Sequence, residues 1–318
     1  MFAFTCPPLA PRSERPSRWR RPRFEGAGGY DGPLIRHQVI PHTLLIVLAL
    51  AGAGCKAPEQ PAVTSIIGAV LIDGAGGPPV SDSLVTIENG RIRAAGARAS
   101  LEVPPGAGEI DGAGQFMVPA VIDVAQMAAR NGVLVVRPGD ADAAIERARQ
   151  EHRPVIADIF SLHDARAMTD RGATVLLHMI RDAEVTDTAF IAQLRDLRMV
   201  CVPMLSTVRD AAELDLAKRN TKRLADGGVR MAVGSAGDTD REMALLVEAG
   251  LSPAQVLVAA TRNGAAALGM LDDTGTIEPG KRADLLLLSA NPVEDIGNMK
   301  KTRRVMRDGQ WVRDGGAR

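Results

Sequence analysis

The 318-residue sequence has few aromatic residues and few cysteines. Phe, Trp and Tyr together make up 3% of the chain, so a folded core must be built from Ala, Val, Leu, Ile and Met. The three cysteines are Cys6, Cys55 and Cys201. Because Cys6 precedes a segment that we expect to be removed, it should not share a mature chain with Cys201, and no disulfide framework is predicted. Cys201 lies in an apolar stretch without an obvious base, which is typical of an unreactive core thiol.

An excess of charge of one sign is also missing. The chain contains 38 basic and 38 acidic residues. Residues 1–38 hold seven Arg and three acidic residues, which leaves 31 basic and 35 acidic residues in the rest of the chain. This slightly acidic remainder carries no basic footprint for nucleic acid, so nucleic-acid binding is not expected.

The main apolar run is too short to cross a membrane comfortably, since a spanning helix needs roughly 20 apolar residues. It is "VIPHTLLIVLALAGAGC" at 39–55, and it follows a Pro-, Gly- and Arg-rich leader at 1–38 that we expect to be disordered. A basic flank, a short apolar run and small residues describe a secretory signal. The ending at Cys55 resembles the lipobox of bacterial lipoproteins, although Gly52 stands where that motif prefers Leu.

Lipidation of Cys55 would place the protein in the bacterial cell envelope, facing the periplasm, with the lipid as its membrane anchor. An ordinary signal peptide of a secreted protein and a non-cleaved anchor are the alternatives. Translation that begins near Val39 would remove the unusually long leader.

Strand-like segments occur at both ends of the remaining chain. "SLVTIENGRIRAAG" at 83–96 predicts two strands around Asn89-Gly90, a strong hairpin signal. Near the other end, "RADLLLLSA" predicts a strand, and "RRVMRDGQWVRDG" predicts a hairpin that turns at Asp308-Gly309. We therefore predict one small composite β-sandwich assembled from residues 61–116 and 277–318.

Residues 117–276 alternate apolar strands with amphipathic helices such as "DTAFIAQLRDLR". Ser252 followed by Pro253 marks the start of a further helix. The alternation predicts βα units around a parallel sheet, and therefore an α/β fold. The strands expected from the apolar runs are 117–123, 133–137, 154–160, 173–178, 199–204 and 229–234.

Five segments, in order, resemble the amidohydrolase superfamily, and in particular its imidazolonepropionase- and prolidase-like lipoproteins. The resemblance implies a metal-dependent hydrolase of carbon–nitrogen bonds other than peptide bonds, with a (β/α)8 TIM-like barrel that carries the composite sandwich. The last segment is close to a hallmark of the family. The segments are "AVLIDGAGGPPVSDSLVTIENGRIRAAG", "IDGAGQFMVPAVID", "ATVLLHMIRDAEVTDTAFIAQLRDLRMVCVPML", "LLVEAGLSPAQVLVAATRNGAAALGM" and "GTIEPGKRADLLLLSANPVEDI".

Hydrolases of this kind hold divalent ions at the carboxyl ends of the barrel strands, where the ions activate water. The first strand of the family reads roughly P-G-[LIV]-[IV]-D-x-H-x-H, but this chain has Ala125 and Met127 at the two histidine positions. Neither side chain can bind a hard or borderline ion. The family also uses a Lys on the next strand, and no Lys occurs between Met127 and Pro154.

Three other positions supply donors if a metal site survives. His178 matches a ligand histidine in kind, and Asp158 stands where another ligand histidine would end its strand. The family's strand-eight Asp falls at Ala236, with Asp238 two residues further on. His178 and Asp158 would then be ligands that bind Zn2+ or another divalent ion weakly, and Asp238 would be the catalytic base. The alternative is a structural role for each residue. Asp158 and Asp238 would each stabilise the start of the following helix, which for Asp238 begins near Thr239, and His178 would be hydrogen-bonded at the end of its strand.

Length provides an independent indication. A complete barrel takes about 250 residues, whereas residues 117–276 supply only 160. We therefore expect a truncated or incomplete barrel in the central domain.

Three interpretations are open. The first is a catalytically degenerate family member in the envelope, without a cofactor, that binds a small molecule or another partner. The second is a working hydrolase of non-peptide C–N bonds such as cyclic amides, or of dipeptides, with a reduced one-metal site. The third is a decaying gene or a faulty gene model whose product barely folds. The substrate and the formation of a homo-oligomer are left open by the sequence.

Overall fold

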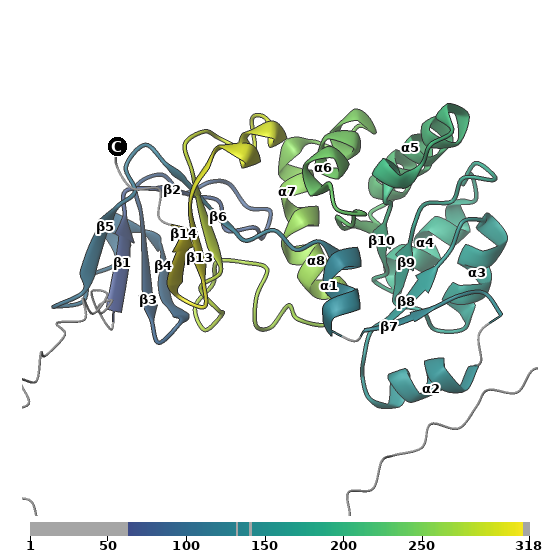
Figure 1. The fold of residues 1–318 in the computed structure, drawn as a ribbon, viewed down its shortest axis with the longest axis horizontal. Coiled ribbons are helices and arrows are strands. Elements are labelled where there is room, and N and C mark those ends of the chain that lie inside the picture. Colours follow the sequence, from purple (N-terminus) through teal and green to yellow (C-terminus); the bar gives the residue numbers. More distant parts are fainter. Residues whose placement is uncertain (1–62, 132, 140–141, 314–318) are drawn as a thin grey trace, which may run out of the picture. The chain divides into compact units, whose positions relative to one another are not determined.

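The computed structural model describes residues 63–131, 133–139 and 142–313. The predicted leader, the predicted signal segment and Cys55 lie outside these ranges. The described residues belong to the unit Lys56–Arg318, one of two into which the chain divides. Two mixed β-sheets and one parallel sheet with flanking helices make up this unit (Figure 1). No helix in the described ranges has the length and apolar character that a membrane span requires.

The first mixed sheet has the strand order β4-β3-β1-β5. β1 runs antiparallel to β3 and parallel to β5. β3 and β4 form the hairpin predicted at Asn89-Gly90, and both turn residues have positive φ, as a two-residue hairpin turn requires. The bounds are β1 (Val63–Ile67), β3 (Ser83–Glu88), β4 (Arg91–Ala97) and β5 (Gly108–Asp111), with a 3-10 helix, η1 (Arg98–Ser100), after β4.

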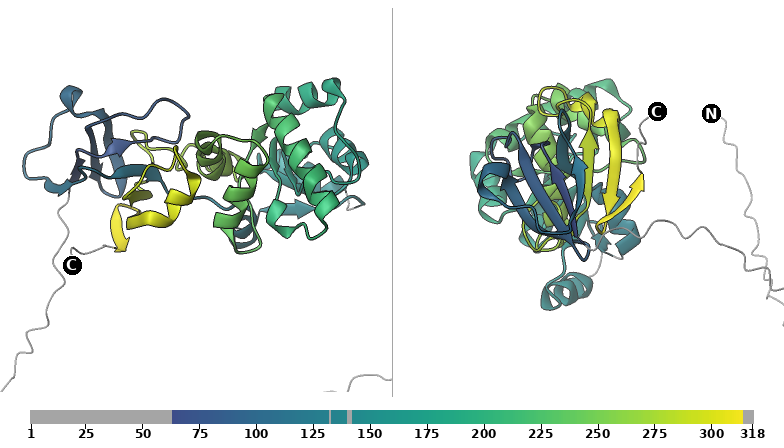
Figure 2. Two further views of the ribbon diagram at one scale, coloured as in Figure 1. Left: turned by 90° about the horizontal axis from the view of Figure 1, so that it is seen from above. Right: turned by 90° about the vertical axis from the view of Figure 1, so that its left-hand side faces the viewer.

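The second mixed sheet joins segments from both ends of the chain, in the order β14-β13-β12-β6-β2. The hairpin predicted at Asp308-Gly309 is present between β13 and β14. These late strands lie beside the early ones in Figures 1 and 2. The bounds are β2 (Val70–Leu71), β6 (Phe116–Pro119), β12 (Leu285–Leu288), β13 (Thr302–Arg307) and β14 (Gln310–Arg313), and η3 (Ile296–Lys301) precedes β13.

The prediction that 117–123 is the first strand of the parallel sheet is wrong. Residues 116–119 pair antiparallel with β12, in the register Val118 to Leu286. β12 is a run of four buried leucines that presents apolar side chains on both faces, so an equally apolar β6 packs best beside it. The strand ends at Pro119, and the chain enters a helix at Val124.

The parallel sheet has the order β11-β10-β9-β8-β7. The predicted α/β alternation is confirmed here, because each of the first four strands is followed by a helix, α2 to α5, that leads to the next one. Within the described ranges no pairing joins β7 to β11, so no closed barrel is present there. The bounds are β7 (Leu134–Val136), β8 (Val155–Asp158), β9 (Val175–Leu177), β10 (Val200–Val202) and β11 (Arg230–Met231).

The helices begin where the sequence supplies capping side chains. Ser252 and Gln255 form a complete capping box at the start of α7, with Pro253 at its first position, as predicted. Ser161, Asp187 and Asp210 cap α3, α4 and α5. The helices are α1 (Val124–Asn131), α2 (Asp142–Gln150), α3 (Leu162–Asp170), α4 (Thr188–Asp196), α5 (Ala211–Asp226), α6 (Thr239–Glu248), α7 (Pro253–Ala260) and α8 (Arg262–Ala267), with the 3-10 helix η2 (Leu205–Thr207) before α5.

The core around the parallel sheet is almost entirely aliphatic, as the shortage of aromatic residues predicts. Phe190 is the one aromatic among the buried residues of its main cluster, together with side chains such as Met168 and Leu194. Cys201 lies in this cluster, and burial raises the pKa of its thiol to about 12. Cys201 is therefore a packing residue, as the sequence indicated.

Asn220 on α5 fixes the segment that follows β9. Its Oδ1 accepts a hydrogen bond from the backbone N–H of Val185 at 2.9 Å. Its Nδ2 donates to the carbonyl oxygens of Ile180 and Ala183, each at 2.9 Å. Asn220 is fully buried, so water cannot take over its hydrogen bonds to these backbone groups.

Replacing Asn220 by Ala is expected to destabilise the protein by about 2–4 kcal/mol, because it leaves buried backbone donors and acceptors unpaired. Urea unfolding monitored by circular dichroism measures this loss. Asn298→Ala is the matched control: its Nδ2 makes one hydrogen bond, to the carbonyl of Asn291, at a half-buried site. Equal losses in the two variants would show that the contacts of Asn220 do not hold the segment.

Candidate functional site

Asp158 and His178 lie at the carboxyl ends of two neighbouring parallel strands. Asp158 is the last residue of β8, and His178 directly follows β9 in a left-handed backbone conformation with φ of 68°. The Asp158 Oδ1 atom and the His178 Nδ1 atom are 2.7 Å apart. The side chains of His178 and Asp158 are only 18% and 13% exposed. The structure therefore brings together two of the three predicted site residues.

Aromatic and cationic groups surround this pair. The ring of Phe160 lies 4.8 Å from the His178 ring, centroid to centroid. The Arg181 guanidinium stacks over Phe160 at 4.6 Å, and Arg137 Nε lies 3.4 Å from Asp158 Oδ2. These three residues were not among the predicted site residues. Phe160 is a large apolar residue two positions past the end of β8, and the fold leaves it 41% exposed. Its place directly after an apolar strand is a signal in the sequence that could have identified it as a candidate site residue.

The two positions that carry histidines in the family pattern lie on a helix here. Ala125 and Met127 belong to the first turn of α1, which begins directly after the strand predicted at 117–123. Both side chains are half-buried and pack against an apolar cluster that includes Ile122 and Val202. They contribute to the core and supply no ligand atoms.

Asp123, which was not among the predicted site residues, is saturated with hydrogen bonds. Its Oδ2 accepts from Ser235 Oγ at 2.6 Å, from Thr239 Oγ1 at 2.9 Å and from Gln126 Nε2 at 3.0 Å. Its Oδ1 accepts from the backbone N–H groups of Gln126 and Ser235, both at 3.1 Å. The carboxylate therefore joins the start of α1 to the start of α6 and has no lone pair directed at a ligand.

Asp238 does not join the pair at β8 and β9. Its Oδ1 accepts from the backbone N–H of Arg241 at 3.0 Å, which caps α6. This is the helix-start role that the sequence offered as the structural alternative. Ala236 is exposed in the preceding loop. The corresponding alternative for Asp158 is wrong, because Ser161 caps α3 while Asp158 binds His178.

The donor groups do not fit a divalent-metal centre. A catalytic zinc takes three protein ligands and a structural zinc takes four. Across the described ranges no group of three or more His, Cys, Asp or Glu side chains is placed to hold an ion. Asp158 and His178 are bound to each other, which leaves Nε2 as the free ring nitrogen of His178.

Glu242 is a second buried carboxylate near the carboxyl end of the sheet. It is fully buried on α6, and it accepts hydrogen bonds from the backbone N–H groups of Leu205 and Ser206 at 2.9 and 2.7 Å. These contacts hold η2, the turn that follows β10. Burial raises the pKa of the Glu242 carboxyl above its ordinary value, and the charge of Asp123 acts in the same direction.

Comparison with known proteins gives one family match and several similar folds. The sequence matches the Amidohydrolase family over residues 120–312. Imidazolonepropionase from Cutibacterium acnes (strain DSM 16379 / KPA171202) is 32% identical over 158 residues, which are 41% of this chain and 39% of that protein. The matched part thus spans well under half the length of this curated relative.

Two solved structures illustrate the likeness in fold. A. niger ochratoxinase has a TM-score of 0.67 at 15% identity, over 81% of this chain and 97% of that chain. A Xaa-Pro dipeptidase with bound methionine has a TM-score of 0.64 at 15% identity, over 79% of this chain and 100% of that chain. At these identities the likeness concerns the fold alone.

Replacing Glu242 by Gln is expected to change how stability depends on pH. Because the folded-state pKa of Glu242 lies above its ordinary value near 4.5, ionisation of this carboxyl destabilises the fold. The stability of the wild type relative to Glu242→Gln should be highest below pH 4.5 and should fall as the pH rises through the folded-state pKa. Urea unfolding of both proteins from mildly acidic to neutral pH measures this difference.

Glu248→Gln on the same helix is a control of opposite sign. Lys218 donates a hydrogen bond to Glu248 and holds the pKa of that carboxyl below its ordinary value. The wild-type advantage over this variant should be present at neutral pH and disappear as the pH falls. A difference for Glu242→Gln that stays constant, or that grows with pH, would show that burial does not control this carboxyl.

Proposed function

Because the chain belongs to the amidohydrolase family, we propose that it keeps the fold of these hydrolases without their divalent-metal chemistry and that it binds a small molecule. The 2.7 Å hydrogen bond between Asp158 and His178 is the observation that supports this most directly. It uses one nitrogen of the imidazole and one oxygen of the carboxylate at a place where the family requires several ligands. One remaining ring nitrogen cannot hold a zinc ion by itself.

The carboxyl ends of β8 and β9 are the proposed binding position. Ligands of open α/β sheets bind in the crevice outside the carboxyl ends of the strands. At this edge the His178 ring and the partly exposed Phe160 ring lie together, with the Arg181 guanidinium stacked on Phe160. Ring faces favour a planar ligand, and the Arg181 guanidinium is itself paired with Glu213 at 3.5 Å.

We further interpret the parallel sheet as a reduced (β/α)8 barrel. Its five strands and the 160 residues of 117–276 fall short of the eight strands and about 250 residues of a full barrel. The two mixed sheets correspond to the proposed composite β-sandwich at 61–116 and 277–318. Their shared apolar cluster, with Val85 and Ile87 from one sheet and Leu285 and Leu287 from the other, supports this assignment.

The second candidate function is hydrolysis of a non-peptide C–N bond, as in a cyclic amide, or of a dipeptide, through one weakly held metal. The names of similar proteins favour it, because they include an imidazolonepropionase and a Xaa-Pro dipeptidase. The His178 Nε2 atom would be one ligand, with Asp158 orienting the ring through Nδ1. Asp238 would have to leave its capping position on α6 to take part as base.

Metal content separates these two candidates. The purified full chain is equilibrated with Zn2+, desalted and analysed by inductively coupled plasma mass spectrometry, and hydrolysis of imidazolonepropionate and of Xaa-Pro dipeptides is assayed in parallel. We expect no stoichiometric zinc, and equal traces in the wild type, in His178→Ala and in a control, His163→Ala. His163 is an exposed residue of α3.

One firmly held zinc per chain that disappears in His178→Ala together with hydrolysis, and persists in His163→Ala, would establish the hydrolase instead. Thermal unfolding of the same samples addresses the interpretation as a decaying or misassigned gene. A cooperative transition is expected for a folded family member. A broad, non-cooperative loss of signal would favour a product that does not fold.

We also propose that the protein is an envelope lipoprotein that is lipidated at Cys55 and anchored in the membrane by its lipid. The small residues that close on Cys55, after a short apolar run and a basic flank, support this. The alternative of an ordinary signal peptide would give a soluble periplasmic or secreted protein.

Cys55→Ser is expected to move the protein from the membrane fraction to the soluble fraction of a bacterial host and to abolish the mass increase due to the lipid. Mass spectrometry of the mature chain and cell fractionation measure both effects. Cys6→Ser is the matched control and should leave both unchanged, because Cys6 lies in the predicted leader. Membrane retention and an unmodified mass in Cys55→Ser would indicate a non-cleaved anchor.

A further inference from the structure

A hollow of about 340 Å³ opens at the amino-terminal end of β11. Its wall is formed by the start of β11, by α7 and by the residues that begin α8. Because the strands of this sheet are parallel, their amino-terminal ends lie on the edge opposite to the carboxyl ends that carry Asp158 and His178. The hollow is therefore separate from the site proposed above. Its volume falls within the range of about 300–1,000 Å³ for small-molecule pockets.

The charged residues that line this hollow are both arginines, Arg230 and Arg262. No carboxylate lines it, and neither guanidinium forms a hydrogen bond or an ion pair with another described residue. Glu278 interacts electrostatically with Arg262, but its carboxylate is bound to Lys281 at 2.8 Å. The hollow thus holds two positive charges that form no ion pair with a described residue.

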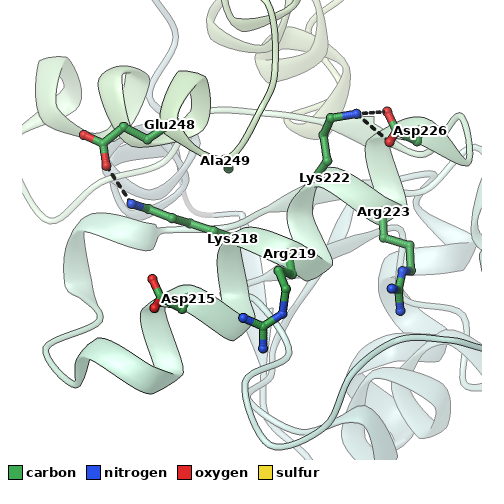
Figure 3. A pocket seen from close by; sticks show the side chains of 8 residues that line it. All are labelled: Asp215, Lys218, Arg219, Lys222, Arg223, Asp226, Glu248 and Ala249. Atoms are coloured by element: carbon green, nitrogen blue, oxygen red, sulfur yellow. Dashed lines mark hydrogen bonds and ion pairs between the residues drawn. The ribbon is translucent and has the colours of Figure 1, made fainter.

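A second hollow, of about 520 Å³ along α5, shows the contrast (Figure 3). Four basic residues line it, but carboxylates lie among them. Lys218 binds Glu248 at 2.6 Å and Lys222 binds Asp226 at 2.5 Å, as the dashed lines in Figure 3 mark. These surface ion pairs, together with those of Arg219 and Arg223 to Glu184, satisfy the basic groups, so this hollow offers an anion no unpaired cation.

The arginines at the first hollow also repel one another. Arg230 is half-buried, and its burial, followed by the positive charges of Arg262 and Arg198, lowers the pKa of its guanidinium. Arg198 lies two residues before Val200, the β10 residue that pairs with Arg230, so the starts of two neighbouring strands bring these cations together. An anion between Arg230 and Arg262 would relieve the repulsion and satisfy their donors.

The rest of the wall is formed by apolar side chains and by an amide side chain that a hydrogen bond holds in place. Val229, Leu251 and Val258 supply aliphatic surface. The Asn263 Nδ2 atom donates to the carbonyl oxygen of Met231 at 2.8 Å, which fixes that side chain in the wall. A ligand matched to this hollow has an anionic head for the arginines and an aliphatic body for the apolar side.

We propose that the hollow between β11, α7 and α8 binds a small organic oxyanion, with its carboxylate or phosphate head on Arg230 and Arg262 and its apolar part against Val229, Leu251 and Val258. The planar guanidinium fork matches the oxygens of either head group. Binding here does not depend on the His178 site, so this inference stands apart from the proposed function.

The test measures binding of four named probes to the full chain by isothermal titration calorimetry. The probes are sodium hexanoate, hexyl phosphate, inorganic phosphate and neutral hexanamide. We expect the two anions with a six-carbon chain to bind, inorganic phosphate to bind more weakly and hexanamide not to bind. Affinity should fall as the salt concentration rises, because the attraction is between charges. A preference between hexanoate and hexyl phosphate identifies the head group.

Arg230→Gln and Arg262→Gln should each weaken binding of the preferred anion about ten-fold or more, as expected for loss of charge-assisted hydrogen bonds. Arg303→Gln is the matched control and should bind as the wild type does, because Arg303 is an exposed residue of β13 outside the hollow. Without ligand, Arg230→Gln should unfold at the same temperature as the wild type or at a higher one, since it removes repulsion.

Two results would overturn the proposal. One is that neither hexanoate nor hexyl phosphate binds the wild type, and the other is that both arginine variants bind as the wild type does. If Arg230→Gln fails to fold, Arg262→Gln decides alone, because Arg262 is exposed and its replacement leaves the core intact.

Discussion

The buried carboxylate of Asp123 is the contact on which the arrangement of this fold depends. It accepts hydrogen bonds from Gln126, Ser235 and Thr239 and so ties the start of α1 to the start of α6, segments more than 100 residues apart in sequence. A buried carboxylate is tolerated only when its lone pairs are occupied. Here protein donors occupy them, so the position that precedes the family's ligand histidines is committed to structure.

The same commitment extends to the neighbouring positions. Ala125 and Met127 fill an apolar cluster, Asp238 caps a helix and Glu242 holds the turn after β10. Asp238 and Glu242 would have to give up these structural contacts before they could bind a cation. Asp158 and His178 remain as a pair that faces partly outward, and their mutual hydrogen bond fixes the orientation of the imidazole ring. The carboxyl edge of the sheet thus holds the His178 imidazole ring in one orientation and leaves few lone pairs for a metal.

Local patterns in the sequence predicted local structure well. The hairpins at Asn89-Gly90 and Asp308-Gly309, the helix start at Ser252, the α/β alternation and the buried Cys201 all follow from side-chain chemistry within a few residues. The capping of α6 by Asp238 is also a local effect, because its partner is the backbone N–H of Arg241.

Long-range contacts decided the features that the sequence did not predict. An apolar strand at 116–119 can pair with any apolar neighbour, and its choice of β12 is determined by a segment about 170 residues away. The Asp158 interaction with His178 and the five hydrogen bonds of Asp123 depend in the same way on which strands become neighbours. The sequence does not reveal that the fold places Arg230 and Arg262 at one hollow without an ion pair to a described carboxylate. The missing information in each case is which strands become neighbours and in which register they pair.

The two edges of the parallel sheet differ in how their charges are compensated. At the carboxyl edge Asp158, Asp238 and Glu242 are each hydrogen-bonded to a side chain or to the backbone, and burial still disfavours the charged form of Glu242. Apolar residues at the vacated histidine positions extend the core. At the amino-terminal edge Arg230 and Arg262 form no ion pair with a described residue, so the proposed anion would be stabilised there by their charge. None of these contacts requires a bound ion, because hydrogen bonds and apolar packing among the described residues hold the sheet and its core together.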